Sequence, residues 1–383
     1  MNIARFGVIV GVSLLVACTG RNSADIAYAG DKYRRWQAPG EFARTFGGPN
    51  VRWIDDDNVL YLAKGESHLD HKICVWTLST GHVREIGPAA GDICYFDGYL
   101  RYVEREHWPN RVVREGTLAE TKATVVPVTR ERELLNEGYR RHPFTCGHYR
   151  VADLAPEENC KVPLLPGHGW LETQGGRCRS EYQSRLHAAN QSSLDENARR
   201  EEKLRIEYAL LANPIRYFSS DREIVLPIEA NEVDWIGSMS FSPWKGAYLI
   251  PQRKAKGDYG ALLGRWPREN YDVYVLLISG QVETVSVPWN RKFYARPGLV
   301  ALSKAGLILA PNGYDAEERK VVHGLLLFAR DSLLSLDVED TQQISVSPNG
   351  CRLAYDAKDL GATKRGQFVV RLRVIDVCAE TNP

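Results

Sequence analysis

The chain lacks the features by which many protein classes are recognised from sequence. Its 383 residues hold two methionines and nearly equal charges, 49 Lys and Arg against 48 Asp and Glu. This balance argues against a broad nucleic-acid interface, which needs a basic excess to release counterions. CxxC pairs, a GxSxG nucleophile motif and a GxxxxGK[ST] phosphate loop are absent from the sequence. We therefore predict no nucleic-acid partner, no cofactor, no metal site and no catalytic residue.

The N-terminus carries the most specific signal that is present. Arg5 precedes a 12-residue apolar run at 6–17. This run is shorter than the roughly 20 residues of a transmembrane helix but suits a signal peptide. The run ends in LVAC at 15–18, which resembles the bacterial lipobox. The alternative is an ordinary secretory signal followed by a chance cysteine.

The lipobox resemblance implies a lipoprotein of the bacterial cell envelope. Cleavage would remove residues 1–17 as the signal peptide, and acylation of Cys18 would attach the chain to a membrane. Thr19 stands where the enterobacterial sorting rule would place Asp for inner-membrane retention, so the resemblance implies the outer membrane, facing the periplasm. About two acyl chains suffice for lasting anchorage. Residues 18–40 are polar and without periodicity, and we expect them to form a tether.

Residues 41–383 repeat one pattern of strands and tight turns. The best-formed copy is ISVSPNGCRLAYDA at 344–357, followed by FVVRLRVIDV at 368–377. Alternating apolar and polar residues predict half-buried antiparallel strands, and the turn glycines suit tight hairpins. Similar units are predicted at 51–87, 92–128, 143–174, 238–288 and 299–337.

These units resemble the blades of a β-propeller, and the SPNG turn before CRLAYDA resembles the repeat of TolB-like propellers. The resemblance implies an all-β fold, a propeller of six or seven four-stranded blades, in which a hairpin at 215–228 would belong to the seventh. The last unit lacks a fourth strand, and we predict that Phe42–Phe46 supplies it. The alternative architecture is a pair of β-sandwiches.

One helical insertion interrupts the repeats at 175–213. A capping-box pattern at Ser193–Glu196 predicts a helix over about 194–212. The apolar residues Leu204, Tyr208 and Leu211 share one face of this helix, so we expect the helix to lie on the body of the protein.

The blade order sorts the connections onto two faces. If the strands of a blade run A to D outward from the axis, the A–B and C–D turns share one face and are tight. The B–C loops and D–A links share the other face, with long segments at 63–72, 104–111, 252–270, 311–323 and 358–367. Insertions on one face of a repeat array usually mark its binding face. We therefore predict a binding surface that includes His68, Asp70, His71, His107, Trp108, Lys256, Tyr259, Trp266 and Tyr314.

Three segments contain candidate chemistry, each with a plainer interpretation. The loop at 66–71 (ESHLDH) holds two imidazoles and carboxylates that suit a divalent metal, or it is a solvated polar loop. The loop at 252–270 mixes basic and aromatic residues that suit anionic peptides or glycans, or it is a flexible surface loop. Asp55–Asp57 resembles a calcium-attracting run, but Asp is favoured in such a tight turn because it accepts local backbone hydrogen bonds.

Seven cysteines remain after Cys18, so at least one stays without an intramolecular partner. Export to an oxidising compartment allows the others to pair. We predict Cys351–Cys378 as cross-strand neighbours, and Cys160–Cys178 and Cys74–Cys94 from their positions near the long-loop face. Cys146 would be the unpaired thiol.

The sequence favours a binding protein over an enzyme. The expected function is that of a lipid-anchored envelope propeller that binds a protein or an envelope polymer through its long-loop face. The alternative is an envelope hydrolase or lyase that acts on glycan or peptide, with polar residues from several B–C loops meeting at the axis. A carboxylate with a raised pKa, or a histidine cluster at the axis, would favour the enzyme.

Overall fold

A computed structural model describes most of the chain from residue 27 onward. The described ranges are 27–44, 50–65, 71–137, 139–150, 161–172, 180–193, 195–211, 214–219, 222–229, 239–252, 270–288, 297–311, 313–315, 320–322, 324–364 and 367–380. Among these residues, no helix is both long and apolar enough to cross a membrane. Cys18, the signal peptide and the first part of the expected tether lie outside them.

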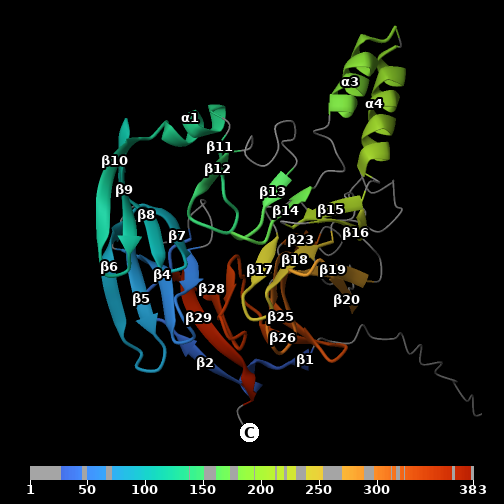
Figure 1. The fold of residues 1–383 in the computed structure, drawn as a ribbon. Helices are drawn as coiled ribbons and strands as arrows, with labels where there is room; N and C mark the ends of the chain where they lie inside the picture. Colours follow the sequence, from blue (N-terminus) through green and yellow to red (C-terminus); the bar gives the residue numbers. More distant parts are fainter. Residues whose placement is uncertain are drawn as a thin grey trace, which may run out of the picture.

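The described strands form six blades with four antiparallel strands each, as a β-propeller requires (Figure 1). The first three blades are β3 (Val51–Trp53), β4 (Asn58–Lys64), β5 (His71–Thr77) and β6 (Val83–Ala89); β7 (Gly91–Phe96), β8 (Tyr99–His107), β9 (Asn110–Thr117) and β10 (Thr121–Pro127); and β13 (Lys161–Pro163), β14 (Trp170–Glu172), β15 (Pro214–Phe218) and β16 (Glu223–Glu229).

The remaining three blades follow the same order. They are β17 (Ser240–Ser242), β18 (Ala247–Pro251), β19 (Asn270–Leu277) and β20 (Val282–Pro288); β21 (Pro297–Leu302), β22 (Leu307–Pro311), β25 (Leu325–Ala329) and β26 (Ser332–Asp337); and β27 (Ile344–Val346), β28 (Arg352–Lys364), β29 (Gln367–Glu380) and β2 (Tyr33–Gln37). The all-β propeller prediction is thus confirmed, and the two-sandwich alternative is wrong.

Alternating strand residues build apolar cores between successive blades. In the sixth blade, Leu353 and Tyr355 face the fifth blade, whereas Ala354 and Val374 face the first. Equivalent clusters join the first blade to the second, the third to the fourth, and the fourth to the fifth. Burial on both faces explains why the inner strands are almost continuously apolar.

An N-terminal strand closes the ring, although not the one that the sequence predicted. β2 pairs antiparallel with β29, with Trp36 opposite Val374. β2 thus takes the place predicted for Phe42–Phe46, of which residues 45 and 46 lie outside the described residues. Phe42 itself forms an isolated bridge with Ala63 and donates its amide to the Val370 carbonyl at 2.8 Å. The expected tether was wrong over residues 27–37. In that stretch Tyr33 packs into the core between the fifth and sixth blades, and Trp36 packs into the core between the sixth and first blades. Residues 27–37 therefore belong to the body.

The third blade differs from the predicted unit at 143–174. Trp170 pairs with Phe218 across β14 and β15, and their rings stack at 3.6 Å between centroids. The hairpin at 215–228 therefore completes the third blade and does not belong to a seventh. The sequence pattern misled because residues 173–213 separate the second strand of this blade from the third.

The described part of the insertion contains two helices, α3 (Ser180–Gln191) and α4 (Glu196–Leu211), where the sequence predicted one. They project from the blades as a hairpin (Figure 1), and Ile206 packs with Leu186 and Ala189 of α3. The expectation that α4 lies on the body is therefore wrong, since its apolar partner is α3. Asp195, not Ser193, caps α4 by accepting a 2.9 Å hydrogen bond from the Ala198 amide.

A separate segment connects the second blade to the third. It comprises α1 (Arg130–Asn136), β11 (Tyr139–Arg141) and β12 (His148–Arg150), and we name it the wedge. On one side, Glu131 of α1 lies 3.1 Å from the Arg111 guanidinium of the second blade. On the other side, Phe144 packs edge-on against Tyr248 of the fourth blade, at 5.1 Å between ring centroids. The wedge thus reaches from the second blade to the core between the third and fourth blades.

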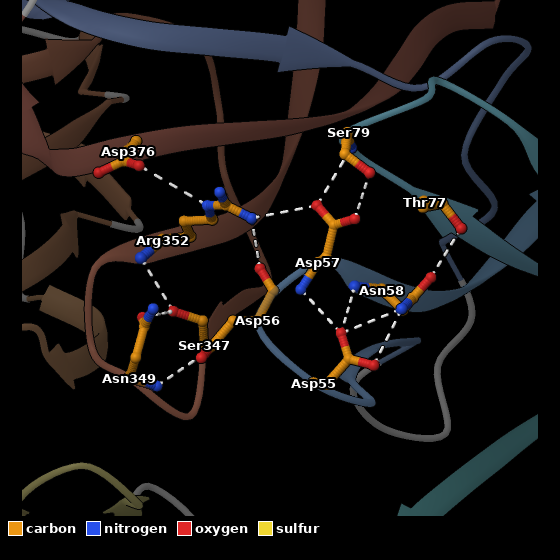
Figure 2. A network of polar contacts seen from close by, with 10 residues as sticks. All are labelled: Asp55, Asp56, Asp57, Asn58, Thr77, Ser79, Ser347, Asn349, Arg352 and Asp376. Atoms are coloured by element: carbon orange, nitrogen blue, oxygen red, sulfur yellow. Dashed lines mark hydrogen bonds and ion pairs between the residues drawn. The ribbon is translucent and has the colours of Figure 1, made fainter.

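A network of polar contacts on the tight-turn side connects the first and last blades (Figure 2). Asp55 Oδ1 accepts hydrogen bonds from the amides of Asp57 and Asn58 at 2.8 Å. These bonds bear out the prediction that the Asp run is a turn. Asp56 Oδ1 accepts from the Asn349 amide at 2.8 Å, and Asp57 lies 3.3 Å from the Arg352 guanidinium. The turn therefore also secures the sixth blade to the first.

The cysteine predictions have mixed outcomes. Cys351 and Cys378 form a disulfide, with 5.1 Å between their Cα atoms, as expected for cross-strand neighbours. Cys94 pairs with Cys146, not with Cys74, at a Cα separation of 5.4 Å. The prediction failed because Cys146 belongs to the wedge and not to the tight turn of a blade. Cys74 is a buried thiol, and Cys160 and Cys178 lie outside the described residues.

Candidate functional site: the long-loop face

The observed strand order places the longest links between described strands on one face of the ring, although residues 253–269 of one link lie outside the described residues. These B–C links join β14 to β15 through α3 and α4, β18 to β19 across 252–269, and β22 to β25 through β23 (Gly313–Asp315) and β24 (Lys320–Val322). The opposite face has turns such as 54–57, 97–98 and 347–351. The predicted asymmetry between the two faces is therefore present in the fold.

Two segments that the sequence analysis treated as long loops are extensions of hairpins. Strands β8 and β9 continue to the pair His107 and Asn110, and β28 and β29 continue to Lys364 and Gln367. Each hairpin thus extends the blade toward the long-loop side with paired strands. A rigid hairpin tip presents a side chain with less loss of conformational entropy than an unpaired loop.

Four residues of the predicted binding surface are described, and all four lie at the long-loop ends of blades. His71 begins β5 and is 9% exposed, so it is largely buried. His107 ends β8, and Trp108 follows it at the hairpin tip with 77% of its surface exposed. Tyr314 lies in β23, opposite Val321. The other members, His68, Asp70, Lys256, Tyr259 and Trp266, lie outside the described residues.

A buried ionic cluster lies beneath this face, where the β26–β27 link meets β28. Arg44 binds Asp340 Oδ2 at 3.0 Å and the Asp340 carbonyl at 2.9 Å, and its Nε donates to Asp356 Oδ2. Asp356 is fully buried, and its Oδ1 accepts from the amides of Gln342 and Gln343 at 2.8 Å. Burial raises the pKa of Asp356, and Arg44 together with these amides opposes the rise.

A second cluster continues the first toward the outer strands. Asp337 Oδ2 accepts from the Tyr355 hydroxyl at 2.7 Å and from Arg373 Nη1 at 3.0 Å. Arg373 Nη2 also binds Glu339 at 3.1 Å. Burial raises the pKa of Glu339 and, more strongly, that of Tyr355. Arg35 of β2 approaches Asp337 to 3.9 Å, so the closing strand joins the same network.

Asp356 and Glu339 are carboxylates with raised pKa values, the feature that would have favoured an enzyme. The geometry around Asp356 nevertheless suits a structural role. Both Asp356 oxygens already accept hydrogen bonds from groups of the chain itself. A general acid or base must be able to reach a substrate proton, and a fully buried carboxylate with both oxygens bonded cannot. No group of three or more metal-ligating side chains occurs within the described ranges. The Arg44–Asp356 cluster therefore holds the β26–β27 link in place beneath the face.

A cavity of about 560 Å³ lies at the opposite, tight-turn end of the second blade. The wedge covers it, and its lining includes Asp97, Tyr99, Arg101, Glu115, Cys146 and His148. The Arg101 guanidinium binds Glu115 at 3.0 Å and approaches Glu131 at 3.6 Å, and His148 Nε2 lies 3.0 Å from Glu131. The tight-turn end therefore has a recess of its own, in which Arg101, Glu115 and His148 already have charged partners within the chain.

The sequence analysis missed Arg44, Asp356 and the wedge residues around Glu131. Asp356 interrupts an apolar strand between Tyr355 and Ala357, and a carboxylate at such a position indicates a buried partner. No pattern in the sequence identified Arg44 as that partner, since the two residues are 312 positions apart.

The chain is similar to several solved structures at about 10% sequence identity. No family model and no curated protein matches the chain. A chain of the mitotic checkpoint complex aligns with 92% of this chain and 97% of its own length, at 10% identity and a TM-score of 0.43. The β-propeller domain of the trilobed protease from Pyrococcus furiosus aligns over 87% and 84%, at 10% identity and 0.32. TolB from Acinetobacter baumannii aligns over 84% and 64%, at 10% identity and 0.35. Similarities at this level carry no information about function.

Proposed function

We propose that the chain is a lipid-anchored β-propeller of the bacterial cell envelope that binds a protein or an envelope polymer through its long-loop face. The observation that supports this function most strongly is the unequal distribution of connections between the two faces of the ring. A rigid ring with variable insertions on one side is suited to recognition, because the blades hold the loops while the loops supply contacts.

Two described features of this face suit a macromolecular partner. The α3–α4 hairpin projects from the β14–β15 link and offers a surface beyond the blades (Figure 1). Trp108 is 77% exposed on a paired hairpin tip. Tryptophan is among the residues most enriched at interaction hot spots. The fully buried Asp356 carboxylate, with both oxygens bonded to the chain itself, favours this binding role over acid–base chemistry.

The anchoring part of the proposal rests on the lipobox resemblance at 15–18 and on Thr19, which suit an outer-membrane lipoprotein facing the periplasm. Replacing Cys18 by Ala should move the protein from the membrane fraction to the soluble periplasmic fraction. A Cys18→Ala protein that still sediments with membranes and withstands alkaline extraction would overturn the lipid anchor.

The binding part is tested by photo-crosslinking in intact envelopes. A photoreactive residue is placed at position 108 or at exposed Arg185 of α3, and the control position is exposed Lys304 in the β21–β22 turn of the opposite face. We expect one shared partner to be captured from positions 108 and 185 and not from 304. Equal capture from position 304 would contradict the assignment of the binding face.

A deletion and an activity assay complete the test. Replacing residues 180–211 by a short Gly-Ser linker removes the helical hairpin, whose ends both lie in one B–C link, and should leave the blades folded. We expect weaker partner capture from position 108 with an unchanged circular dichroism spectrum of the β-sheet. Turnover of a cell-wall glycan or peptide by the purified protein, without a captured partner, would overturn the binding function in favour of the enzyme.

A further inference from the structure

The chain enters the folded body on the outer edge of the fifth and sixth blades. β1 (Ala27–Tyr28) pairs in parallel with β26, and the Ala29 amide donates to the Ser335 carbonyl at 2.8 Å. The short helix η1 (Gly30–Lys32) then leads into β2, the outer strand of the sixth blade. Figure 1 shows β1 and β2 close together on this edge. We name residues 27–37 together with Val338 the N-terminal rim.

The distance between the lipid and this rim is bounded by covalent geometry. Nine peptide units separate Cys18 from Ala27, and an extended chain spans at most about 3.6 Å per residue, or roughly 30 Å in all. A compact body of about 350 residues has a radius of gyration of roughly 20 Å and therefore a diameter of about 50 Å. If Cys18 carries the lipid, as the proposed function states, the N-terminal rim lies within roughly 30 Å of the membrane. The opposite side of the ring is about 50 Å from the rim and therefore lies farther from the membrane.

The composition of the rim suits a membrane surface with anionic lipids. Lys32 and Arg34 are exposed, and Tyr28 is 48% exposed. The Arg34 guanidinium lies over the Trp36 ring at 4.6 Å, and Arg35 lies over Tyr28 at 5.8 Å. Aromatic rings are enriched at the headgroup level of membranes, and each basic residue near an anionic surface contributes about 1 kcal/mol.

Two further side chains complete the description of the rim. Val338 adds an apolar side chain that is 65% exposed, one residue beyond the end of β26. Asp31 is the acidic exception, since it is an exposed residue that directly precedes Lys32. The rim nevertheless combines the basic, aromatic and apolar groups that membrane-surface segments use.

We propose that the N-terminal rim rests on the anionic surface of the membrane that holds the lipid anchor, so that the ring stands on its edge. In this orientation the propeller axis runs along the membrane plane. The long-loop face then opens sideways into the periplasm, where a partner can reach it without passing between the ring and the membrane. The proposal rests on lipidation of Cys18 for its short tether and on the described rim for its contacts.

Photo-crosslinking of the full lipidated chain in envelopes tests the orientation. A photoreactive residue replaces Arg34 on the rim, and the control replaces exposed Lys122 on β10, the outer strand of the second blade. We expect phospholipid adducts at position 34 to exceed those at position 122 at least fivefold. Equal labelling of the two positions in a protein that fractionates with membranes would overturn the orientation. A protein that does not fractionate with membranes would instead contradict the lipid anchor of the proposed function.

A second measurement examines the rim without the lipid. The mature chain carrying Cys18→Ala is mixed with vesicles of phosphatidylethanolamine and 30% phosphatidylglycerol, chosen as the probe. Replacing Lys32 and Arg34 by Gln should lower the vesicle partition coefficient about ten- to thirtyfold, because two surface cations of about 1 kcal/mol each are removed. The matched control replaces exposed Arg84 and Lys122 on the outer strands of the first two blades by Gln. An equal loss in the control would overturn the rim as the contact surface.

Discussion

Asp356 is fully buried and forms an ion pair with Arg44. Substituting Asp356 therefore tests how much this pair stabilises the ring. Its Oδ2 accepts from Arg44, a residue of the segment that runs from β2 toward β3. The Arg44 side chain is 17% exposed and also binds Asp340. Removing one member of a buried ion pair is costly, because the remaining charge is left without compensation.

We expect Asp356→Asn to lower the free energy of unfolding by about 3 kcal/mol, since Arg44 would retain only Asp340. Urea unfolding at neutral pH measures the change. The control is Glu85→Gln, which breaks a pair with Lys72 whose side chains are about half exposed, and it should cost less than about 1 kcal/mol. Equal losses in the two variants would show that the Asp356 pair contributes no more than a surface contact.

The cysteines provide a second prediction at the scale of single residues. Burial, assisted by the charge of Glu85, raises the pKa of the Cys74 thiol to about 11, so we expect it to resist alkylation in the folded protein. Non-reducing mass mapping should recover Cys94 linked to Cys146 and Cys351 linked to Cys378. Alkylation of Cys74 before unfolding, or a Cys74–Cys94 peptide, would contradict the observed arrangement of the second blade and the wedge.

Among the elements, the wedge is the one whose attachment should depend on pH. Burial acts to raise the pKa of Glu131, but the hydrogen bond from His148 and the charges of His148, Arg141 and Arg101 outweigh it and hold this pKa below its ordinary value. A lowered carboxyl pKa contributes stability that is present above the pKa of the unfolded state and is lost as the pH falls through the folded pKa. Acid should therefore loosen the wedge.

We expect Glu131→Gln to reduce the unfolding free energy at pH 6, with the difference from the native chain shrinking as the pH falls from about 5 to 3. Urea unfolding at several pH values measures this difference. Glu133→Gln on the same helix removes a more exposed pair with Arg130 and serves as the control. A difference that stays constant down to pH 3 would contradict the role of the Glu131 charge.

The elements also show which parts of the fold could be predicted from sequence. Period-two alternation together with the Asp turn at 55–57 located the strands of 51–63, and alternation with the turn at Gly350 located those of 344–357. These signals are local, because alternate side chains of one strand pack against the two neighbouring blades. The strands of the third blade were predicted wrongly from the sequence. A helical insertion separates the first two strands from the last two, and a local pattern does not show that the two halves pair. The wedge and the Arg44–Asp356 pair depend on contacts between residues far apart in sequence, and these leave no periodic trace.

At the scale of the whole molecule, ring closure depends on contacts at both faces and along the outer edge. The tight-turn side joins Asp56 and Asp57 to the sixth blade (Figure 2), and the long-loop side joins Arg44 to Asp356. Between them, β2 adds the fourth strand of the last blade. Because β2 comes from the opposite end of the chain, its pairing with β29 joins the two ends of the chain in the last blade.

We therefore expect removal of residues 18–37 to destabilise the whole ring, whereas removal of 18–26 should change the unfolding free energy by no more than about 0.5 kcal/mol. The longer deletion takes away the buried Tyr33, whose burial contributes about 1.5–3 kcal/mol, and Trp36, which is partly buried between blades. The expected loss is at least about 3 kcal/mol in urea unfolding, with an increase in the radius of gyration measured by X-ray scattering.

A synthetic peptide of residues 27–37 should restore part of the loss, because the vacant edge of β29 would accept it as a strand. Identical unfolding of the two truncated chains would mean that β29 needs no outer partner and that the blades close the ring without the N-terminal strand.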